Sequence, residues 1–199
     1  YIICFVEKAD VFLYDKSVIK KFNIRGGIRM DVFTAIKDRR SIRKYSSRIV
    51  EEDVLRKVLD AARLSPSAKN AQAWKFVVAR DKSTIAKLAE AAEGQAFVGE
   101  APVIICSCGT EPDGIMMCGQ YRYTVDLSIA TAYMILEAYE QGLGTCWLGR
   151  FDEKKVKEIL NIPENVRIVA MTTLGYPAKK PSPRPRKDFD SVICFDKYY

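Results

Sequence analysis

The chain of 199 residues contains no histidine. This absence excludes nucleophile schemes of the Ser–His and Cys–His type, in which an imidazole accepts the proton. It also excludes every metal site that needs a histidine ligand. Any chemistry must therefore come from other side chains or from a bound cofactor.

Disulfide frameworks and long apolar runs are also missing. The six cysteines have no tight paired spacing, and several lie in apolar runs such as residues 103–106, where cysteine usually acts as a small buried hydrophobe. The single residue between Cys106 and Cys108 is not the usual metal-ligand spacing, so no metal is expected. No apolar stretch approaches the ~20 residues that span a bilayer. We expect reduced thiols in a cytoplasmic protein without a membrane partner.

The composition that remains is a globular mixture, with 48% hydrophobic and 29% charged residues in a length that suits one domain. Lys and Arg number 32 against 25 Asp and Glu, which gives a net charge of +7. Such a surplus fits a solvated basic surface, and it also fits an anionic partner. A basic–aromatic stripe and a helix-turn-helix pattern are both missing, so no nucleic-acid partner is expected.

The quality of the pattern changes near Met30. Residues 1–29 mix apolar and charged residues without a clear period, whereas Met30 and Asp31 open a regular helical pattern. We therefore expect an N-terminal extension over residues 1–29 and one domain over residues 30–199.

Helices and strands follow one another without regular alternation, which favours an α+β fold over a doubly wound sheet. Apolar spacing and capping residues predict helices over residues 32–37, 51–63, 83–92, 123–141 and 153–160, with Asp81 or Ser83 capping the third. Strands are predicted at residues 74–79, 103–106, 145–148, 166–174 and 192–195.

The long helix predicted over residues 123–141 is apolar around nearly all of its circumference. Such a helix is buried on most sides, in a core or at a subunit interface. One chain has few other elements to cover it, so a second copy of the chain is the simplest cover. Residues 192–195 follow a Pro-rich connector over residues 180–185, and we expect them to add a strand to the partner's sheet.

Two basic stretches are separated by most of the chain. Residues 39–45 read Arg-Arg-Ser-Ile-Arg-Lys-Tyr, and residues 184–187 read Arg-Pro-Arg-Lys. The planar fork of arginine matches phosphate oxygens, and a serine hydroxyl adds a further donor. The plain alternative is a solvated turn and a solvated tail.

Two further stretches carry polar or flexible backbone groups. Residues 65–74 read Ser-Pro-Ser-Ala-Lys-Asn-Ala-Gln-Ala-Trp, whose amides and hydroxyls suit the edge of a heterocycle, or simply form a polar loop. In residues 142–152 the glycines permit close backbone approach, and Gly149 frees an N–H near a strand end; a helix stop followed by a strand explains them equally. Cys146 lacks a histidine to activate it and is a poor nucleophile.

In this order, the stretches resemble the FMN-dependent nitroreductase family. The family pattern has an RRSxR stretch after the first helix, a PSxxNxQxW loop, a GLGTCWxGxFD stretch after the long central helix, a GYP turn and a basic PRK-like end. The matching residues here are 39–45, 66–74, 142–152, 175–177 and 185–187. The resemblance implies a nitroreductase-like fold: a mixed or antiparallel sheet flanked by helices, a long helix buried at a dimer interface, and exchanged C-terminal strands.

The resemblance also implies FMN in a cleft shared by both chains of a homodimer. Phosphate contacts are implied for Arg39, Arg40 and Ser41, together with Arg184 or Arg186. A further set is implied around the flavin ring and ribityl chain: Arg43 at the pyrimidine edge, Trp147, Leu148 and Gly149 on the ring, Gln95 at the ring edge, and Pro66, Ser67, Asn70 and Gln72 from the other subunit. The Gly149 N–H is a candidate donor to flavin N5.

No catalytic side chain is then needed, because the chemistry belongs to the flavin. The resemblance implies ping-pong transfer, in which NAD(P)H gives hydride to FMN and an acceptor such as a nitroaromatic or a quinone enters the same site. A flavin or quinone reductase on the same scaffold, and a flavin-binding sensor or storage protein, remain the alternatives.

Overall fold

The computed structural model describes residues 31–198. The extension predicted over residues 1–29 lies outside these described residues, so the boundary at Met30 stays a prediction.

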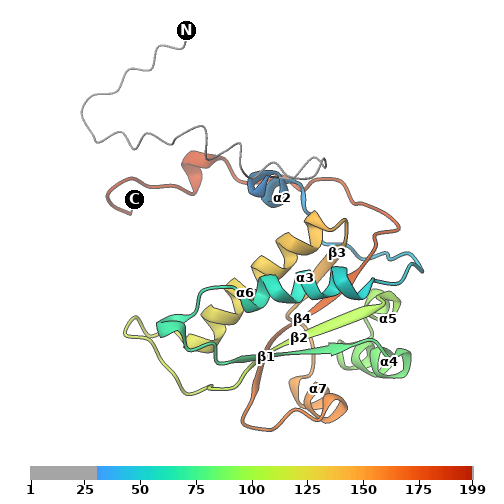
Figure 1. Cartoon of the computed structure of the whole chain (residues 1–199). Coiled ribbons are helices and arrows are strands. Elements are labelled where there is room, and N and C mark those ends of the chain that lie inside the picture. The colour runs from blue at the N-terminus through green and yellow to red at the C-terminus, as the bar shows by residue number, and fades with distance from the viewer. Residues whose placement is uncertain (1–30, 199) are drawn as a thin grey trace, which may run out of the picture. The chain divides into compact units, whose positions relative to one another are not determined.

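A four-stranded sheet forms the centre of the fold, in the order β1-β2-β4-β3 (Figure 1). The strands are β1 (Trp74–Ala79), β2 (Val103–Gly109), β3 (Gly144–Leu148) and β4 (Arg167–Gly175). All three pairings are antiparallel, which resolves the expected mixed or antiparallel sheet. Every residue of β2 is buried, because β2 lies between β1 and β4 and both of its faces are covered.

Helices cover both faces of this sheet. They are α2 (Val32–Asp38), α3 (Glu52–Arg63), α4 (Lys82–Ala91), α5 (Ala96–Glu100), α6 (Arg122–Glu140) and α7 (Glu153–Leu160), with short 3₁₀ turns η1 (Ala68–Asn70) and η2 (Phe189–Ser191). Asp31, Asp81 and Asp152 accept hydrogen bonds from backbone N–H groups of the first turns of α2, α4 and α7. Asp81, and not Ser83, is therefore the cap of α4.

The sheet separates two apolar cores. Side chains of α3 and α6 pack on one face against Val103 and Ile105 of β2. Side chains of α4 and α7 pack on the other face against Ile104 and Cys106. The alternation along β2 follows from the two-residue period of a strand, and it fixes the register of the whole sheet.

The long helix α6 is less covered within one chain than its composition suggests. Leu127, Ala130 and Met134 are fully buried, but Tyr133 on the same helix is 45% exposed. Among residues 31–198, no helix combines the length and the apolarity needed to cross a membrane.

Two sequence expectations differ from the structure. Residues 192–195 form no strand; they follow η2 as turns and bends, and Phe195 is 68% exposed. A strand needs a neighbour to complete its hydrogen bonds, and residues 192–195 pair with none of the strands formed by residues 31–198. The short helix α5 was not predicted, because five residues are too few to show a helical period.

Candidate functional site

The first basic stretch is fixed against the free edge of β3. Ser41 forms a parallel bridge with Thr145, and the Ile42 N–H donates to the Thr145 carbonyl oxygen at 2.8 Å. The Ile42 side chain is buried over Gly144, where an added Cβ would lie only 2.7 Å from the Ile42 Cβ. Because Ile42 points inward, its neighbours Ser41 and Arg43 lie exposed.

The second basic stretch is brought to the same place by a short backbone ladder. The Ser46 N–H donates to the Tyr176 carbonyl at 2.8 Å, and the Ala178 N–H donates to the Lys44 carbonyl at 2.9 Å. An antiparallel bridge between Tyr45 and Pro177 lies between these bonds. Residues 181–186 consequently run beside residues 37–43, although they are separated by most of the sequence.

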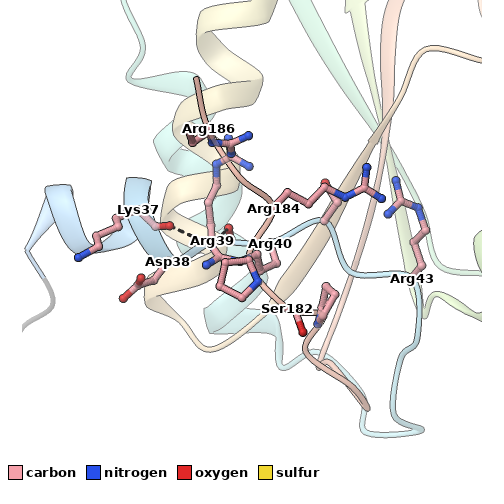
Figure 2. A pocket seen from close by; sticks show the side chains of 11 residues that line it. Lys37, Asp38, Arg39, Arg40, Arg43, Ser182, Arg184 and Arg186 are labelled. Carbon is pink, nitrogen blue, oxygen red and sulfur yellow. Dashed lines mark hydrogen bonds between the residues drawn. The ribbon is translucent and has the colours of Figure 1, made fainter. Parts of the chain in front are cut away.

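A cavity of about 410 Å³ lies between the two segments. Its lining residues are Lys37, Asp38, Arg39, Arg40, Ser41, Arg43, Pro181, Ser182, Pro183, Arg184 and Arg186. Figure 2 shows the guanidinium groups of Arg43 and Arg184 pointing toward each other, while the carboxylate of Asp38 points away from them. Within residues 31–198, the five arginines of this cavity take part in no ion pair. Cations gathered without a carboxylate partner make a site for an anion such as a phosphate.

Arg40 differs from the other arginines of the cavity. One of its terminal nitrogens donates to the carbonyl oxygens of Lys37 and Arg39, at 2.8 and 2.7 Å. These are carbonyls at the C-terminal end of α2, so Arg40 closes that helix end. Its Nε is buried without a partner. That orphaned donor fits an anion in the cavity, since buried donors are normally satisfied.

The end of β3 and the residues just after it hold the side chains and backbone groups expected near the flavin ring. Trp147 is 37% exposed, whereas Leu148 is buried in a core, so Leu148 presents its backbone rather than its side chain. An added Cβ at Gly149 would meet nothing within 4 Å, so packing within the chain does not explain this glycine. The Gln95 side-chain amide donates to the Arg150 carbonyl at 3.2 Å, next to Gly149.

Arg43 is also held from the side of α5. Its guanidinium carbon lies 5.6 Å from the ring centroid of Phe97, a cation–π arrangement. Burial raises the pKa of the neighbouring Cys146 thiol, and the nearby Arg43 charge opposes this only in part. Cys146 therefore stays a neutral thiol, in line with its expected lack of nucleophilic reactivity.

The amide-rich loop, residues 65–74, has a strained backbone that is held in place by hydrogen bonds. Non-glycine residues Lys69, Asn70 and Gln72 have φ values of 55°, 53° and 50°. The Gln72 N–H donates to Ser67 Oγ at 3.0 Å, and the Ala68 N–H donates to the buried Asp126 of α6 at 3.0 Å. Left-handed backbone at three of four positions costs free energy, and such strain gathers at ligand sites.

The predicted site residues fall into two groups that one chain keeps apart. The amide-rich loop, with Pro66, Ser67, Asn70 and Gln72, is fixed at Asp126 near the start of α6. Ser41, which lines the arginine cavity, bridges Thr145 of β3. This strand follows the C-terminal end of α6 (Figure 1). Asp126 lies 14 residues before Glu140, the last residue of α6, a rise of about 21 Å at about 1.5 Å per residue. Within one chain the two groups therefore lie near opposite ends of α6.

Sequence reasoning missed several residues that shape these groups. Asp126 was detectable as a carboxylate in the first half of a strongly apolar helix, where a buried carboxylate needs a hydrogen-bond donor. Lys37, Ser182 and Phe97 gave no comparable signal, because their place depends on how distant segments pack. No cluster of three or more potential metal-binding side chains occurs among the residues that the structure describes.

Known proteins share both the sequence pattern and the fold. The family model described as Nitroreductase family matches residues 36–105 and 93–176. A Thermus thermophilus protein named NADH dehydrogenase is 34% identical, over 83% of this chain and 96% of its own length. A solved structure of an FMN-dependent nitroreductase from Clostridium difficile R20291 is 30% identical, has a TM-score of 0.74, and covers 83% of this chain and 99% of its own. A Bacillus subtilis protein named FMN reductase [NAD(P)H] is 26% identical, over 84% of this chain and 74% of its own length. The chain, whose fold and motifs agree with these relatives, belongs to the nitroreductase family.

Proposed function

We propose that the chain is an NAD(P)H-dependent FMN oxidoreductase that works as a homodimer with two shared active sites. The observation that carries this proposal is the arginine cavity without carboxylate partners, set at the far end of α6 from the amide-rich loop. Names of the relatives, such as FMN-dependent nitroreductase and FMN reductase, support the same cofactor and reaction class.

The arginine cavity is the proposed phosphate site. Arg39, Arg184 and Arg186 would hold the phosphate oxygens through their forks, while Ser41 adds a hydroxyl donor. Arg40 would contribute its orphaned Nε, since one terminal nitrogen already serves the carbonyls of α2. Both Arg184 and Arg186 line the cavity, so both are included.

The groups at the end of β3 would orient the ring. Bound FMN would supply the chemistry, accepting hydride from NAD(P)H and passing electrons to a second substrate in a ping-pong cycle. Arg43 provides a cation for the edge of the ring where negative charge develops on reduction. The Gly149 N–H is the proposed donor to the ring, at a residue where an added Cβ would meet nothing within 4 Å, and the neighbouring Trp147 is 37% exposed.

A second copy of the chain would complete the site with its amide-rich loop. Each chain has apolar surface available for such an interface: Val32 and Phe33 of α2 are 70% and 71% exposed, and Phe195 near the C-terminus is 68% exposed. Obligate interfaces resemble a divided core, and they cover side chains of this kind. We expect the segment over residues 192–195 to become ordered as a strand on the partner's sheet.

The acceptors we propose are nitroaromatics and quinones. Free flavin is the second candidate, favoured by the relative named FMN reductase. We place the protein in the cytoplasm, because Cys106, Cys108 and Cys146 are buried thiols outside disulfides, as is usual in a reducing compartment.

Two measurements test the proposal. Flavin released from the purified protein by heat should be FMN, at about one per chain, and apo protein should take FMN up again. A steady-state screen should pair NADH and NADPH with a nitroaromatic, a quinone and free FMN. NAD(P)H oxidation that depends on the acceptor supports the enzyme; tight FMN binding without turnover would point to a sensor or storage protein instead.

A further inference from the structure

Three side chains outside the cavity form a closed cluster, here called the Tyr176 cluster: Arg48, Glu51 and Tyr176. The Tyr176 hydroxyl donates to Glu51 Oε2 at 2.6 Å. Arg48 donates to Glu51 Oε1 through Nε and a terminal nitrogen, at 3.2 and 2.7 Å. The Arg48 guanidinium carbon also lies 3.8 Å from the centroid of the Tyr176 ring. Each member thus contacts the other two.

The cluster stands where the two arginine segments separate from the body of the protein. Tyr176 directly follows β4 and precedes residues 177–186, and its carbonyl accepts the Ser46 N–H. Glu51 is the residue at the start of α3, and Arg48 lies in the connection that leads from residues 39–45 to this helix. The cluster therefore ties both arginine segments to one point, the N-terminal end of α3.

The two segments need such a tie because of their charge and their exposure. They bring five arginines to one cavity, and none of these arginines forms an ion pair within residues 31–198, so the like charges repel each other. Residues 177–186 are exposed throughout. Near the cavity, the second segment is fixed by the ladder at residues 44–46 and 176–178 and by a contact of Lys180 with Tyr139.

We propose that Arg48, Glu51 and Tyr176 are positioning residues that set the spacing of the two arginine segments and thereby the affinity for the phosphate of FMN. This inference rests on the proposed function. None of the three lines the cavity, so they act through the backbone and not by contact with the ligand.

The Tyr176 cluster keeps the same charges near neutral pH. Hydrogen bonds from Tyr176 and Arg48 lower the pKa of the Glu51 carboxyl to about 2, so it stays ionised near neutral pH. An exposed ion pair between Arg48 and Glu51 would by itself contribute little. Tyr176 contributes most to the tie, because its hydroxyl joins the ion pair to the point where residues 177–186 leave β4.

The test compares two ligands that differ by the phosphate alone. Dissociation constants of FMN and riboflavin are measured by flavin fluorescence with apo protein, for wild type, Tyr176→Phe and Glu51→Gln. We expect each variant to bind FMN about five- to tenfold more weakly, which lies within the range for loss of one ordinary hydrogen bond, with riboflavin affinity unchanged. The preference for FMN over riboflavin should therefore shrink by the same factor.

A matched control comes from the other end of α3. Asp60→Asn removes an exposed ion pair with Arg63, 2.6 Å between the charged atoms, of the same sequence spacing as Arg48 and Glu51. It should leave the affinities for both ligands unchanged.

The outcomes separate the two ideas. Variants that keep the wild-type preference for FMN, or lose FMN and riboflavin equally, overturn the positioning role while the proposed function stands. A wild-type protein that binds neither flavin overturns the proposed function itself. Tyr176→Phe removes one half-exposed hydroxyl, and thermal unfolding of each apo variant verifies that it is folded.

Discussion

Single side chains of the cavity show how far residue chemistry can be predicted. Arginine and serine in one short stretch indicate an anion site from their donors alone, and the structure places them around one cavity. The direction of Arg40 could not be predicted in this way. Its side chain donates to the carbonyls of Lys37 and Arg39 because α2 ends at Asp38. The last residue of a helix can be predicted from sequence only to within one or two positions.

Arg43→Ala should make the bound flavin harder to reduce. A cation at the ring edge stabilises the anionic reduced state more than the neutral oxidised state, by about 2–4 kcal/mol, or roughly 40–90 mV for a two-electron couple. We expect a midpoint potential lower by about this amount in a spectroelectrochemical titration, with FMN largely retained. Lys44→Ala, a neighbouring charge that does not line the cavity, is the control. An unchanged potential in Arg43→Ala would remove Arg43 from the ring edge.

The buried thiols should be inert in the native protein. Burial raises the pKa of Cys108 from an ordinary value of 9.0 to about 11, and it raises the pKa of Cys106 as well. At pH 8 both are neutral and inaccessible, so a thiol reagent followed by mass spectrometry should label exposed Cys118 and spare them. Because the unfolded thiols ionise first, stability should fall as pH rises above about 9. Rapid labelling of Cys106 in native protein would contradict this packing.

At the scale of elements, a helix or strand could be predicted when its own residues determine it, and could not when it depends on contacts with distant segments. The strand Trp74–Ala79 was predicted with its observed bounds, because its β-branched and aromatic residues follow turn residues directly. The strand expected at residues 192–195 was wrong for the single chain: pairing depends on a neighbouring edge, and these residues meet none within the described range 31–198. The docking of residues 39–45 on β3 likewise depends on Gly144, for which the sequence offered close backbone approach or a helix stop but did not indicate Ile42 as the approaching residue.

Two glycines of one stretch should respond differently to alanine. At Gly144 a new Cβ would collide with the buried Ile42 and push residues 41–43 off the edge of β3. We expect Gly144→Ala to lose about 1–3 kcal/mol of unfolding free energy, as overpacked cores do. At Gly149 the chain leaves open space, so Gly149→Ala should keep the apo stability and weaken FMN binding.

Denaturant unfolding of both apo proteins, together with FMN titration, checks this pair. Equal stability of the two alanine variants would show that the docking of Ile42 over Gly144 is not tightly packed. Unchanged FMN affinity in Gly149→Ala would show that no ligand approaches that backbone.

At the scale of the whole molecule, the proposed function makes the two groups near opposite ends of α6 two half-sites of one chain. The motifs predicted both groups of residues, but their separation within a chain emerges only when α6 and the sheet are in place. Sequence alone could not show this, because residue order gives no measure of distance between residues 39–45 and 66–74. The central claim is accordingly that each active site needs the arginine segment of one chain and the amide-rich loop of the other.

Complementation between two inactive variants tests that claim most directly. Arg39→Ala/Ser41→Ala removes the phosphate grip and leaves Arg40 to close α2, while Asn70→Ala/Gln72→Ala removes the ring loop. Each variant should lack NAD(P)H oxidation by itself. The two variants are then unfolded and refolded together in equal amounts. Random pairing makes half of the dimers mixed, and each mixed dimer regains one of its two sites. About a quarter of the wild-type activity should therefore return. No recovered activity in the refolded mixture, or an FMN-loaded monomer in sedimentation, would contradict the shared site.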